Sequence, residues 1–169
     1  MSSRPARIVV RRAQPSDLDA VVKMRSALIE DSRGNLAYRR LRRDYAAAAR
    51  PLFAAQLGDP RCLTLVATVG EEPVGLLRCM LSAPNPLHEP ARHAYVVSVY
   101  VVPQERRRGV LKALVRAADA WCASHDIDEM RLHVGVENKV GNAAWKALGF
   151  ESAEILRVRR IPKRRNKIN

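Results

Sequence analysis

The sequence predicts a mixed α/β sheet with helices on both faces, and three observations support this fold class. Segments rich in β-branched residues alternate with segments whose apolar residues recur at helical spacing. Proline and glycine separate them at short intervals, giving the order strand, two helices, three strands, helix, strand, helix and an extended C-terminal region. The chain has 169 residues, of which 47% are hydrophobic. We therefore expect residues 1–169 to form a single domain.

The N-terminal part contains the first strand and two helices. Residues 7–12 favour a short strand, and Ser16 is placed to cap a helix with Asp19 three residues later. A second helix, rich in alanine and arginine, is expected over about 36–57. We expect Pro51 to break it, since proline removes a backbone donor.

Three strands follow in the middle of the chain. Residues 62–69 and 74–81 flank a Gly-Glu-Glu-Pro turn, which is typical of a hairpin. Residues 94–102 form an almost wholly β-favouring run, typical of a central strand covered on both faces.

The C-terminal part supplies the remaining elements. Residues 110–121 carry a regular apolar stripe at helical spacing, 131–136 form a strand, and 142–148 form a short helix that Gly149 ends. Residues 150–161 favour one or two final strands. The sheet is therefore expected to have six or seven strands, with about four helices distributed over its two faces.

Several classes of protein are excluded at this stage. No apolar run approaches the ~18 residues that a membrane span needs, and the first residues lack the apolar core of a secretory signal. Cys62, Cys79 and Cys122 have no Cys-x-x-Cys spacing, and the four histidines form no metal-binding pair. We therefore expect buried thiols, a cytoplasmic location and no metal.

The charge balance is strongly basic, with 30 Lys and Arg against 17 Asp and Glu, a net charge of +13. This excess favours an anionic partner, either a phosphorylated ligand or nucleic acid. The basic tail at about 162–169 has two interpretations, a solvated C-terminus or a weak contact with RNA or DNA through phosphate neutralisation.

The segment between the most apolar strand and the most regular helix has the clearest chemistry. Arg106, Arg107 and Arg108 precede Gly109 at the expected start of the helix. A helix N-terminus already carries about half a positive charge, so three cations there are unfavourable unless an anion binds. Gly109 would let a phosphate approach the backbone closely. The alternative is a solvated basic turn.

Two segments together resemble the GNAT superfamily of N-acetyltransferases, which move an acetyl group from acetyl-CoA to an amine. The pyrophosphate motif of that family has Gln or Arg, then Gly three positions later, then Gly or Ala two positions after it. Arg106 and Gly109 match this motif, whereas Leu111 departs from it. The segment from Leu132 to Asn138, followed by Gly-Phe at 149–150, resembles the second family signature. The resemblance covers about residues 7–160 and implies a mostly antiparallel, three-layer sheet.

The resemblance also implies where the cosubstrate binds. The backbone near Gly109 would hold the CoA pyrophosphate, the preceding strand would pair with the pantetheine arm, and Asn138 would contact that arm near the thioester. Trp145 stands where many family members place an acidic tyrosine; indole is not a practical acid, so packing is its alternative role. The expected cofactor-binding residues are Val101, Val102, Arg106, Arg107, Arg108, Gly109, Val110, Leu111, Asn138 and Trp145.

The reaction implied is direct attack of a neutral amine in a ternary complex, so a base would help. Glu137 and Tyr100 are the expected catalytic residues, with His133 as a further candidate; their alternative roles are solvated loop, core and strand packing. Barring a bulge, pleat alternation places Ser98 and Tyr100 on one face of their strand and Tyr95 on the other.

The acceptor amine, a small molecule or a protein, is not identified by the sequence. If the arginines at 39–43 line its groove, a polycationic acceptor is repelled and one with an anionic group is favoured. Two alternative functions stay open: a nucleic-acid- or ribosome-associated basic protein, and a GNAT-like domain that binds acetyl-CoA without catalysis. The resemblance further implies a homodimer.

Overall fold

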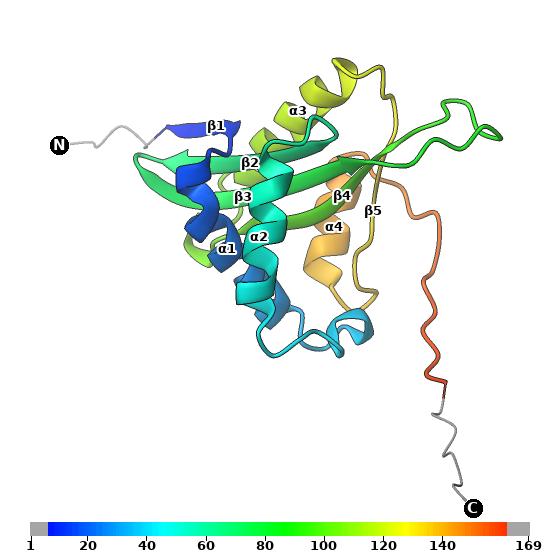
Figure 1. Cartoon of the computed structure of the whole chain (residues 1–169), viewed down its shortest axis with the longest axis horizontal. Coiled ribbons are helices and arrows are strands. Elements are labelled where there is room, and N and C mark those ends of the chain that lie inside the picture. Colours follow the sequence, from blue (N-terminus) through cyan, green and yellow to red (C-terminus); the bar gives the residue numbers. More distant parts are fainter. Residues whose placement is uncertain (1–6, 162–169) are drawn as a thin grey trace, which may run out of the picture.

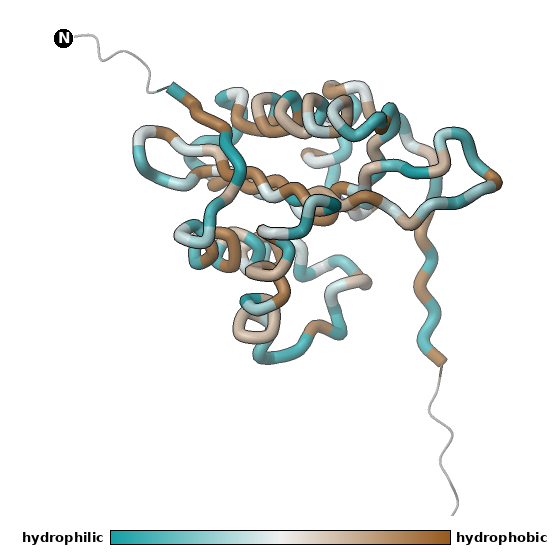
Figure 2. Tube along the Cα trace, turned by 45° about the horizontal axis from the view of Figure 1, so that its top comes forward, coloured by the Kyte–Doolittle hydropathy of each residue, from teal (hydrophilic) through white to brown (hydrophobic). Residues whose placement is uncertain are grey.

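The computed structural model describes residues 7–161, and its elements form three layers. Figure 2 shows one long helix above the strands and two helices below them. Figure 1 shows the same elements along the chain. They are β1 (Ile8–Arg12), η1 (Pro15–Asp17), α1 (Leu18–Asp31), η2 (Leu36–Tyr38), α2 (Tyr45–Leu57), β2 (Cys62–Val69), β3 (Glu72–Leu81), β4 (Ala94–Val101), η3 (Pro103–Glu105), α3 (Val110–Ala123), β5 (Met130–Leu132) and α4 (Lys139–Ala147).

The sheet has the order β1-β2-β3-β4-β5. The first four strands are antiparallel to their neighbours, and β5 runs parallel to β4. A mixed, mostly antiparallel sheet with helices on both faces is therefore confirmed. The expectation of six or seven strands is wrong for the described residues, because 150–161 form no strand and lead away from the body of the molecule. A strand needs a partner, and β5 offers a paired length of only three residues.

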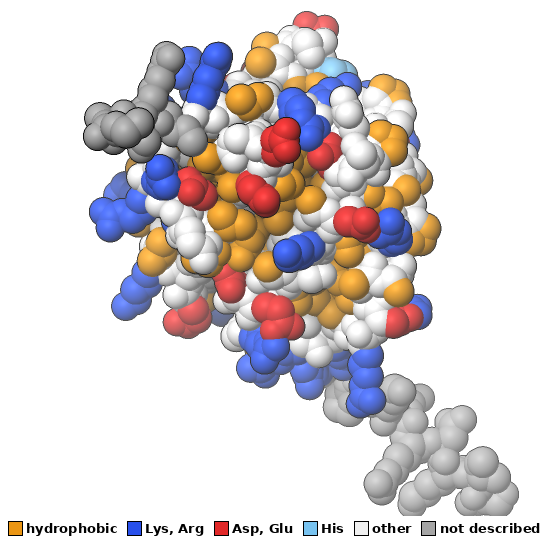
Figure 3. All heavy atoms as spheres, turned by 90° about the vertical axis from the view of Figure 1, so that its left-hand side faces the viewer, with side chains coloured by type: hydrophobic (Ala, Val, Ile, Leu, Met, Phe, Trp, Pro, Cys, Tyr) orange, Lys and Arg blue, Asp and Glu red, His pale blue; other side chains and the backbone are white. Residues whose placement is uncertain are grey.

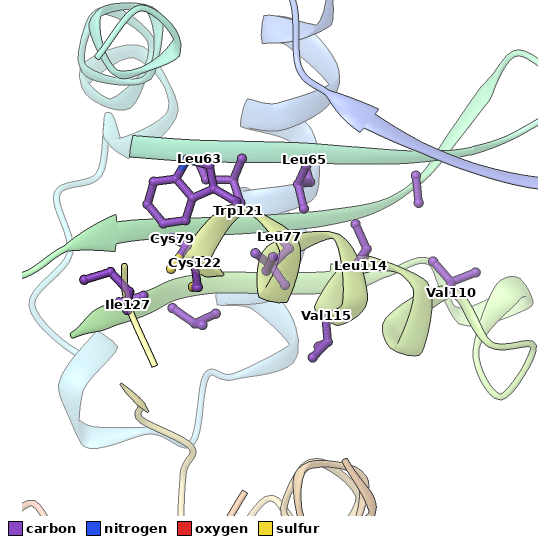
Figure 4. Packing of buried hydrophobic residues seen from close by; sticks show 14 of the residues in the cluster. Leu63, Leu65, Leu77, Cys79, Val110, Leu114, Val115, Trp121, Cys122 and Ile127 are labelled. Carbon is purple, nitrogen blue, oxygen red and sulfur yellow. The ribbon is translucent and has the colours of Figure 1, made fainter. Parts of the chain in front are cut away.

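Each face of the sheet has its own hydrophobic core. Side chains of α3 pack on one face, where Leu114 is fully buried against Leu77 and its neighbours (Figure 4). On the other face, Val21 of α1 and Phe53 of α2 pack against Leu76. The apolar stripe predicted for α3 is the buried side of that helix. No helix among residues 7–161 is long and apolar enough to cross a membrane.

The first two helices differ from the sequence expectation. Ser16 does not cap α1; instead η1 precedes the helix, and the carboxylate of Asp17 accepts a hydrogen bond from the backbone of Gln14 at 2.7 Å. The second helix begins only at Tyr45 and continues through Pro51. The carbonyl that Pro51 leaves without a backbone donor belongs to an exposed turn, where water can satisfy it.

Strand β4 contains a bulge at Val97. Arg78 of β3 is opposite Ser98, whereas the next residue, Cys79, is opposite Val96, so Val97 is the extra residue. The bulge reverses the alternation that the sequence predicts. Side chains on either side of Val97 that would point to opposite faces now point to the same face.

The face that these residues share is the one covered by α1 and α2. Met80 of β3 contacts Gln56 of α2 and is opposite Tyr95, while Tyr100 packs in the core beneath the same helices. Tyr95 therefore lies on the same face as Ser98 and Tyr100, and the prediction that it points the other way is wrong. Beyond the bulge, buried and half-buried residues alternate along β4, so the strand is not fully covered on both faces.

Candidate active site

Strands β4 and β5 diverge after a short region of pairing. Ala94–Val96 pair with Met130–Leu132, but β4 continues to Val101 while β5 ends at Leu132 (Figure 1). Among the described residues, the edge of β4 that faces away from β3 therefore has no strand beside it from Val97 to Val101. Such an edge can pair with an extended ligand that carries amide groups.

The direction of the backbone groups on this edge follows from two hydrogen bonds. The N–H of Val102 donates to Val74 of β3 at 2.9 Å, so alternation turns the polar groups of Val101 towards the open side. There the carbonyl of Val101 accepts a hydrogen bond from Nε of Arg106 at 2.9 Å. Val99 presents its N–H and C=O to the same side by the same alternation.

The loop that follows forms a row of backbone donors. Arg107 and Gly109 have positive φ angles of 62° and 88°, and Gly109 is the N-cap of α3. Within residues 7–161, the N–H groups from Arg107 to Lys112 donate no hydrogen bond to the protein. A Cβ added at Gly109 would meet no atom within 4 Å, so the approach to this row is open. The loop and the helix dipole together suit a phosphate.

The three arginine side chains of this loop have different surroundings. Nη2 of Arg106 binds Asp31 of α1 at 2.7 Å, and its guanidinium lies 5.6 Å from the centre of the Tyr100 ring. Arg108 binds Glu105 at 3.0 Å. Arg107 forms no ion pair within the described part of the chain. Arg106 thus fastens the loop to α1, a contact between residues 75 positions apart.

The departure from the family motif at Leu111 does not obstruct the row of donors. Leu111 packs against the core beneath α3, beside Val110, which is 1% exposed. Its branched side chain is therefore directed away from the N–H groups of the loop.

The loop between β5 and α4 is held by two asparagines. Oδ1 of Asn138 accepts from the N–H of Gly141 at 2.8 Å and caps α4. Nδ2 of Asn142 donates to the carbonyls of Gly135 at 3.0 Å and Asn138 at 2.8 Å. Sequence reasoning missed Asn142, although its spacing of four residues from Asn138 is a signal that both lie on one side of a helical turn.

The remaining predicted site residues lie in dissimilar environments. Trp145 packs edge-on against Phe150 with ring centres 5.1 Å apart, in agreement with a packing role. Tyr100 is 9% exposed in the core beneath α1 and α2. Glu137 is exposed on the loop before α4 and forms no ion pair within residues 7–161.

A polar pair occurs where β4 and β5 begin to diverge. The hydroxyl of Tyr95 is hydrogen-bonded to Nδ1 of His133, and the two rings meet edge to face at 5.4 Å. Burial raises the pKa of Tyr95, so its hydroxyl is protonated at neutral pH. Sequence reasoning considered both residues separately; their contact required the parallel pairing of the two strands and the bulge.

The three cysteines are buried, as expected. Burial raises the pKa of Cys79 to about 12 and that of Cys122 to about 11, so neither is a thiolate at neutral pH. Burial also raises the pKa of Cys62, so none of the three thiols is activated as a nucleophile by its surroundings.

Comparison with known proteins gives a consistent result. The model of the acetyltransferase (GNAT) family matches residues 26–150. An aminoglycoside N(6')-acetyltransferase type 1 from Acinetobacter haemolyticus is 30% identical over 60 residues, which cover 36% of this chain and 41% of that protein. The chain thus spans about two fifths of the length of the first curated relatives it matches. A protein of the same name from Stenotrophomonas maltophilia is 29% identical over 153 residues, 90% of this chain and 92% of the relative.

Solved structures resemble the fold over nearly the whole chain. The aminoglycoside antibiotic 6'-N-acetyltransferase AAC(6')-IG from Acinetobacter haemolyticus has a TM-score of 0.71 at 20% identity, covering 94% of this chain and 99% of that one. An acetyltransferase with acetyl-CoA from Clostridium acetobutylicum has a TM-score of 0.75 at 17% identity, covering 90% and 96%. At these identities the likeness concerns the fold.

Proposed function

Because the chain belongs to the acetyltransferase (GNAT) family, we propose that it transfers an acetyl group from acetyl-CoA to a primary amine by direct attack in a ternary complex. One observation carries the proposal: the row of free N–H groups from Arg107 to Lys112 adjoins the unpaired edge of β4. The row suits a pyrophosphate and the edge suits an amide-containing arm, in the order in which these groups occur along CoA.

The residues proposed to bind acetyl-CoA divide into two groups. Val101 and Val102 end the open edge of β4, and the loop with the first turn of α3 supplies Arg106, Arg107, Arg108, Gly109, Val110 and Leu111. We propose that the backbone of the loop holds the pyrophosphate and that Arg107 adds charge, while Arg106 acts by positioning the loop. Asn138 and Trp145 would form the opposite wall, through the α4 cap and its packing.

The acetyl thioester supplies the activated acyl group when acetyl-CoA is bound. The protein's task is then to align the amine with it and to accept a proton from the attacking nitrogen. The Tyr95–His133 pair lies at the start of the divergence on the face covered by α1 and α2. We propose that the proton passes to the oxygen of Tyr95 while the tyrosine's own proton moves to Nδ1 of His133. Tyr100 and Glu137 have no comparable contact.

The acceptor amine and any macromolecular partner of this protein are also matters of proposal. The two sequence relatives named above are aminoglycoside acetyltransferases, so an aminoglycoside amine is one candidate acceptor. Homodimerisation and a nucleic-acid contact stay predictions, and the basic tail at 162–169 lies outside the described residues. One domain for 1–169 also stays a prediction.

The proposal is tested by incubating the protein with acetyl-CoA and a panel of primary amines. We expect release of free CoA thiol that depends on the amine, together with a product heavier by one acetyl group in mass spectrometry. Binding of acetyl-CoA without transfer to any amine would instead support the non-catalytic alternative.

A further inference from the structure

Two arginines on the α1–α2 face of the sheet have no carboxylate partner among residues 7–161. Arg78 of β3 is 6% exposed, and its guanidinium lies 3.8 Å from the centre of the Phe53 ring while Nη2 donates to Gln56. Arg25 of α1 is half-buried. Neither forms an ion pair in this part of the chain.

Three buried polar atoms in this region lack a hydrogen-bond partner within the described residues. They are Nε of Arg78, Nη1 of Arg25 and Oγ of Ser98. Ser98 is 4% exposed and is directly opposite Arg78 across β3 and β4, so the two side chains are neighbours on one face. Buried donors without partners cost free energy, and such atoms are rare in native structures.

Burying the charge of Arg78 also costs free energy, and no ion pair within residues 7–161 offsets this cost. Burial lowers the pKa of Arg78 to about 10; Tyr45 partly opposes this shift and the like charge of Arg25 adds to it, and Arg78 still carries its charge at neutral pH. The carboxylates of α1, the helix that carries Arg25, already form ion pairs with other residues: Asp19 with Arg50, Glu30 with Arg33, and Asp31 with Arg106. In the part of the chain that the structure describes, the two cations therefore lie close together and neither is paired with a carboxylate.

We name Arg25, Arg78 and Ser98 together the Arg25–Arg78 cluster. Two half-buried tyrosines, Tyr38 and Tyr45, lie beside it. Arg25 lies 5.4 Å from the ring centre of Tyr38 and 5.8 Å from that of Tyr45. Tyr95 lies on the same face of β4 as Ser98, so the cluster and the Tyr95–His133 pair share the face that α1 and α2 cover.

We propose that the Arg25–Arg78 cluster binds a carboxylate of the acceptor, so that the substrate is an amine that also carries a carboxyl group, as an amino acid does. The inference rests on the proposed acetyl transfer. A carboxylate accepts hydrogen bonds at two oxygens with about four lone pairs, which matches one unpaired nitrogen on each of the two arginines and the unpaired hydroxyl of Ser98. Its amine would then lie towards Tyr95 and His133. A polycation such as an aminoglycoside is disfavoured at this cluster.

The test compares acids with their amides, which differ in the charge to be recognised. L-Lysine, L-phenylalanine and β-alanine are each paired with the corresponding amide, with kanamycin and spermine added. We expect at least one acid to raise the thermal midpoint more than its amide does. We also expect that acid to be acetylated with a kcat/KM roughly tenfold to a hundredfold higher than its amide. Equal effects of all acids and amides, or kanamycin or spermine as the best acceptor, would overturn the proposal.

Variants separate recognition from folding. Arg78→Met is expected to abolish the preference for the acid without lowering the midpoint of the ligand-free protein, because it removes a buried charge that has no partner. Arg25→Gln, at a half-buried site, should reduce the preference as well. Arg61→Met is the matched control: it removes the same charge from an exposed residue paired with Asp59, and should keep the preference. A lower midpoint for Arg78→Met with the preference intact would assign Arg78 a structural role.

Acetyl-CoA binding distinguishes the two levels of failure. Calorimetric titration with acetyl-CoA should give the same affinity for the parent, for Arg78→Met and for Arg25→Gln. No binding by the parent would contradict the proposed function itself. Normal binding with no discrimination between acids and amides would contradict only the carboxylate site.

Discussion

At the scale of single residues, the contact between Tyr95 and His133 is the strongest candidate for proton transfer. The substitution His133→Gln removes the group that accepts the proton of Tyr95. It is expected to lower kcat/KM at pH 7 by about a hundredfold, with little change in acetyl-CoA affinity. The deficit should shrink as the pH rises towards the amine's own pKa of ~10.4, because the substrate then loses its proton to water.

The matched variants for this prediction are Tyr95→Phe and the double variant with His133→Gln. If the two residues act as one unit, the double variant should be no slower than the worse single variant. A pH-independent deficit, or multiplicative losses, would assign both residues to packing. Glu137→Gln provides the comparison with the candidate that the sequence favours.

Asp17 provides a prediction about stability rather than catalysis. Its carboxylate receives hydrogen bonds from Arg11 at 2.6 and 2.9 Å and from the backbone of Gln14, and these hold its pKa below the usual value. A lowered pKa stabilises the fold above the unfolded pKa of ~3.9, and this stabilisation disappears as the pH falls through the folded pKa.

Asp17→Asn is therefore expected to lower the free energy of unfolding by about 1–2 kcal/mol at pH 7, because Arg11 is partly solvated and the pair is screened. Urea unfolding at several pH values measures the difference from the parent. The difference should be constant above pH ~5 and shrink below pH ~4. A difference that persists unchanged into acid would show that packing, not charge, makes residue 17 important.

Single residues also show what sequence reasoning could reach. Gly109 and the arginines before it were assigned to an anion site from their position alone, because the rule on helix N-termini is local. The ion pair between Arg106 and Asp31 joins residues 75 positions apart, and no local rule predicts it. The Arg25–Arg78 cluster is likewise formed by three elements, α1, β3 and β4, that meet only in the folded chain.

At the scale of elements, the contact between β3 and the first turn of α3 sets the position of the donor row. A Cβ at Gly75 would lie 2.7 Å from Cγ1 of Val110 and 3.1 Å from Cδ1 of Leu114. Gly75→Ala is therefore expected to destabilise the protein by about 1–3 kcal/mol and to weaken acetyl-CoA binding by displacing the helix start.

Adding Val110→Ala should relieve the clash, so the double variant is expected to be about 1 kcal/mol more stable than the sum of the single effects. Gly58→Ala is the control, since its Cβ would meet only a carbonyl at 3.9 Å and its φ is ordinary. Chemical unfolding of the parent, the two single variants at Gly75 and Val110, and their double variant gives the coupling energy directly. Additive losses would mean that Gly75 is required for another reason.

Elements were predicted well where one periodicity dominated. Cys62–Val69 has the predicted bounds, and the buried stripe of α3 is the predicted one. The bulge at Val97 has no sequence signal, since it consists of one more valine in an apolar run. Residues 150–161 have strand propensity but no partner strand in the described chain, and Ile155 and Leu156 remain exposed there. Propensity alone does not make a strand.

At the scale of the whole molecule, the excess of positive charge does not form a single basic patch on the face shown in Figure 3. Figure 3 shows acidic and basic side chains interspersed around an apolar area on the face towards β1. Most arginines in the described residues that form ion pairs are exposed, so these pairs add little stability. The cations that we propose to bind ligands, Arg107 at the loop and the pair Arg25 and Arg78 beneath α1 and α2, form no ion pair within residues 7–161.

The proposed acetyl-CoA site depends on one arrangement, in which the open edge of β4 leads to the N-terminus of α3. The order of elements could be predicted from the sequence, and the family resemblance implied the site. The divergence of β4 from β5 could not be predicted from periodicity, because the residues that follow Leu132 continue to favour a strand.

The most direct measurement is calorimetric titration of acetyl-CoA into the parent, Gly109→Trp and Gly70→Trp. Both glycines have positive φ and no neighbour within 4 Å of an added Cβ, so both substitutions strain the backbone, but Gly70 lies in the β2–β3 turn and is not part of the donor row. We predict micromolar binding for the parent and Gly70→Trp and almost none for Gly109→Trp. Equal binding by all three proteins would contradict the assignment of the loop as the CoA site.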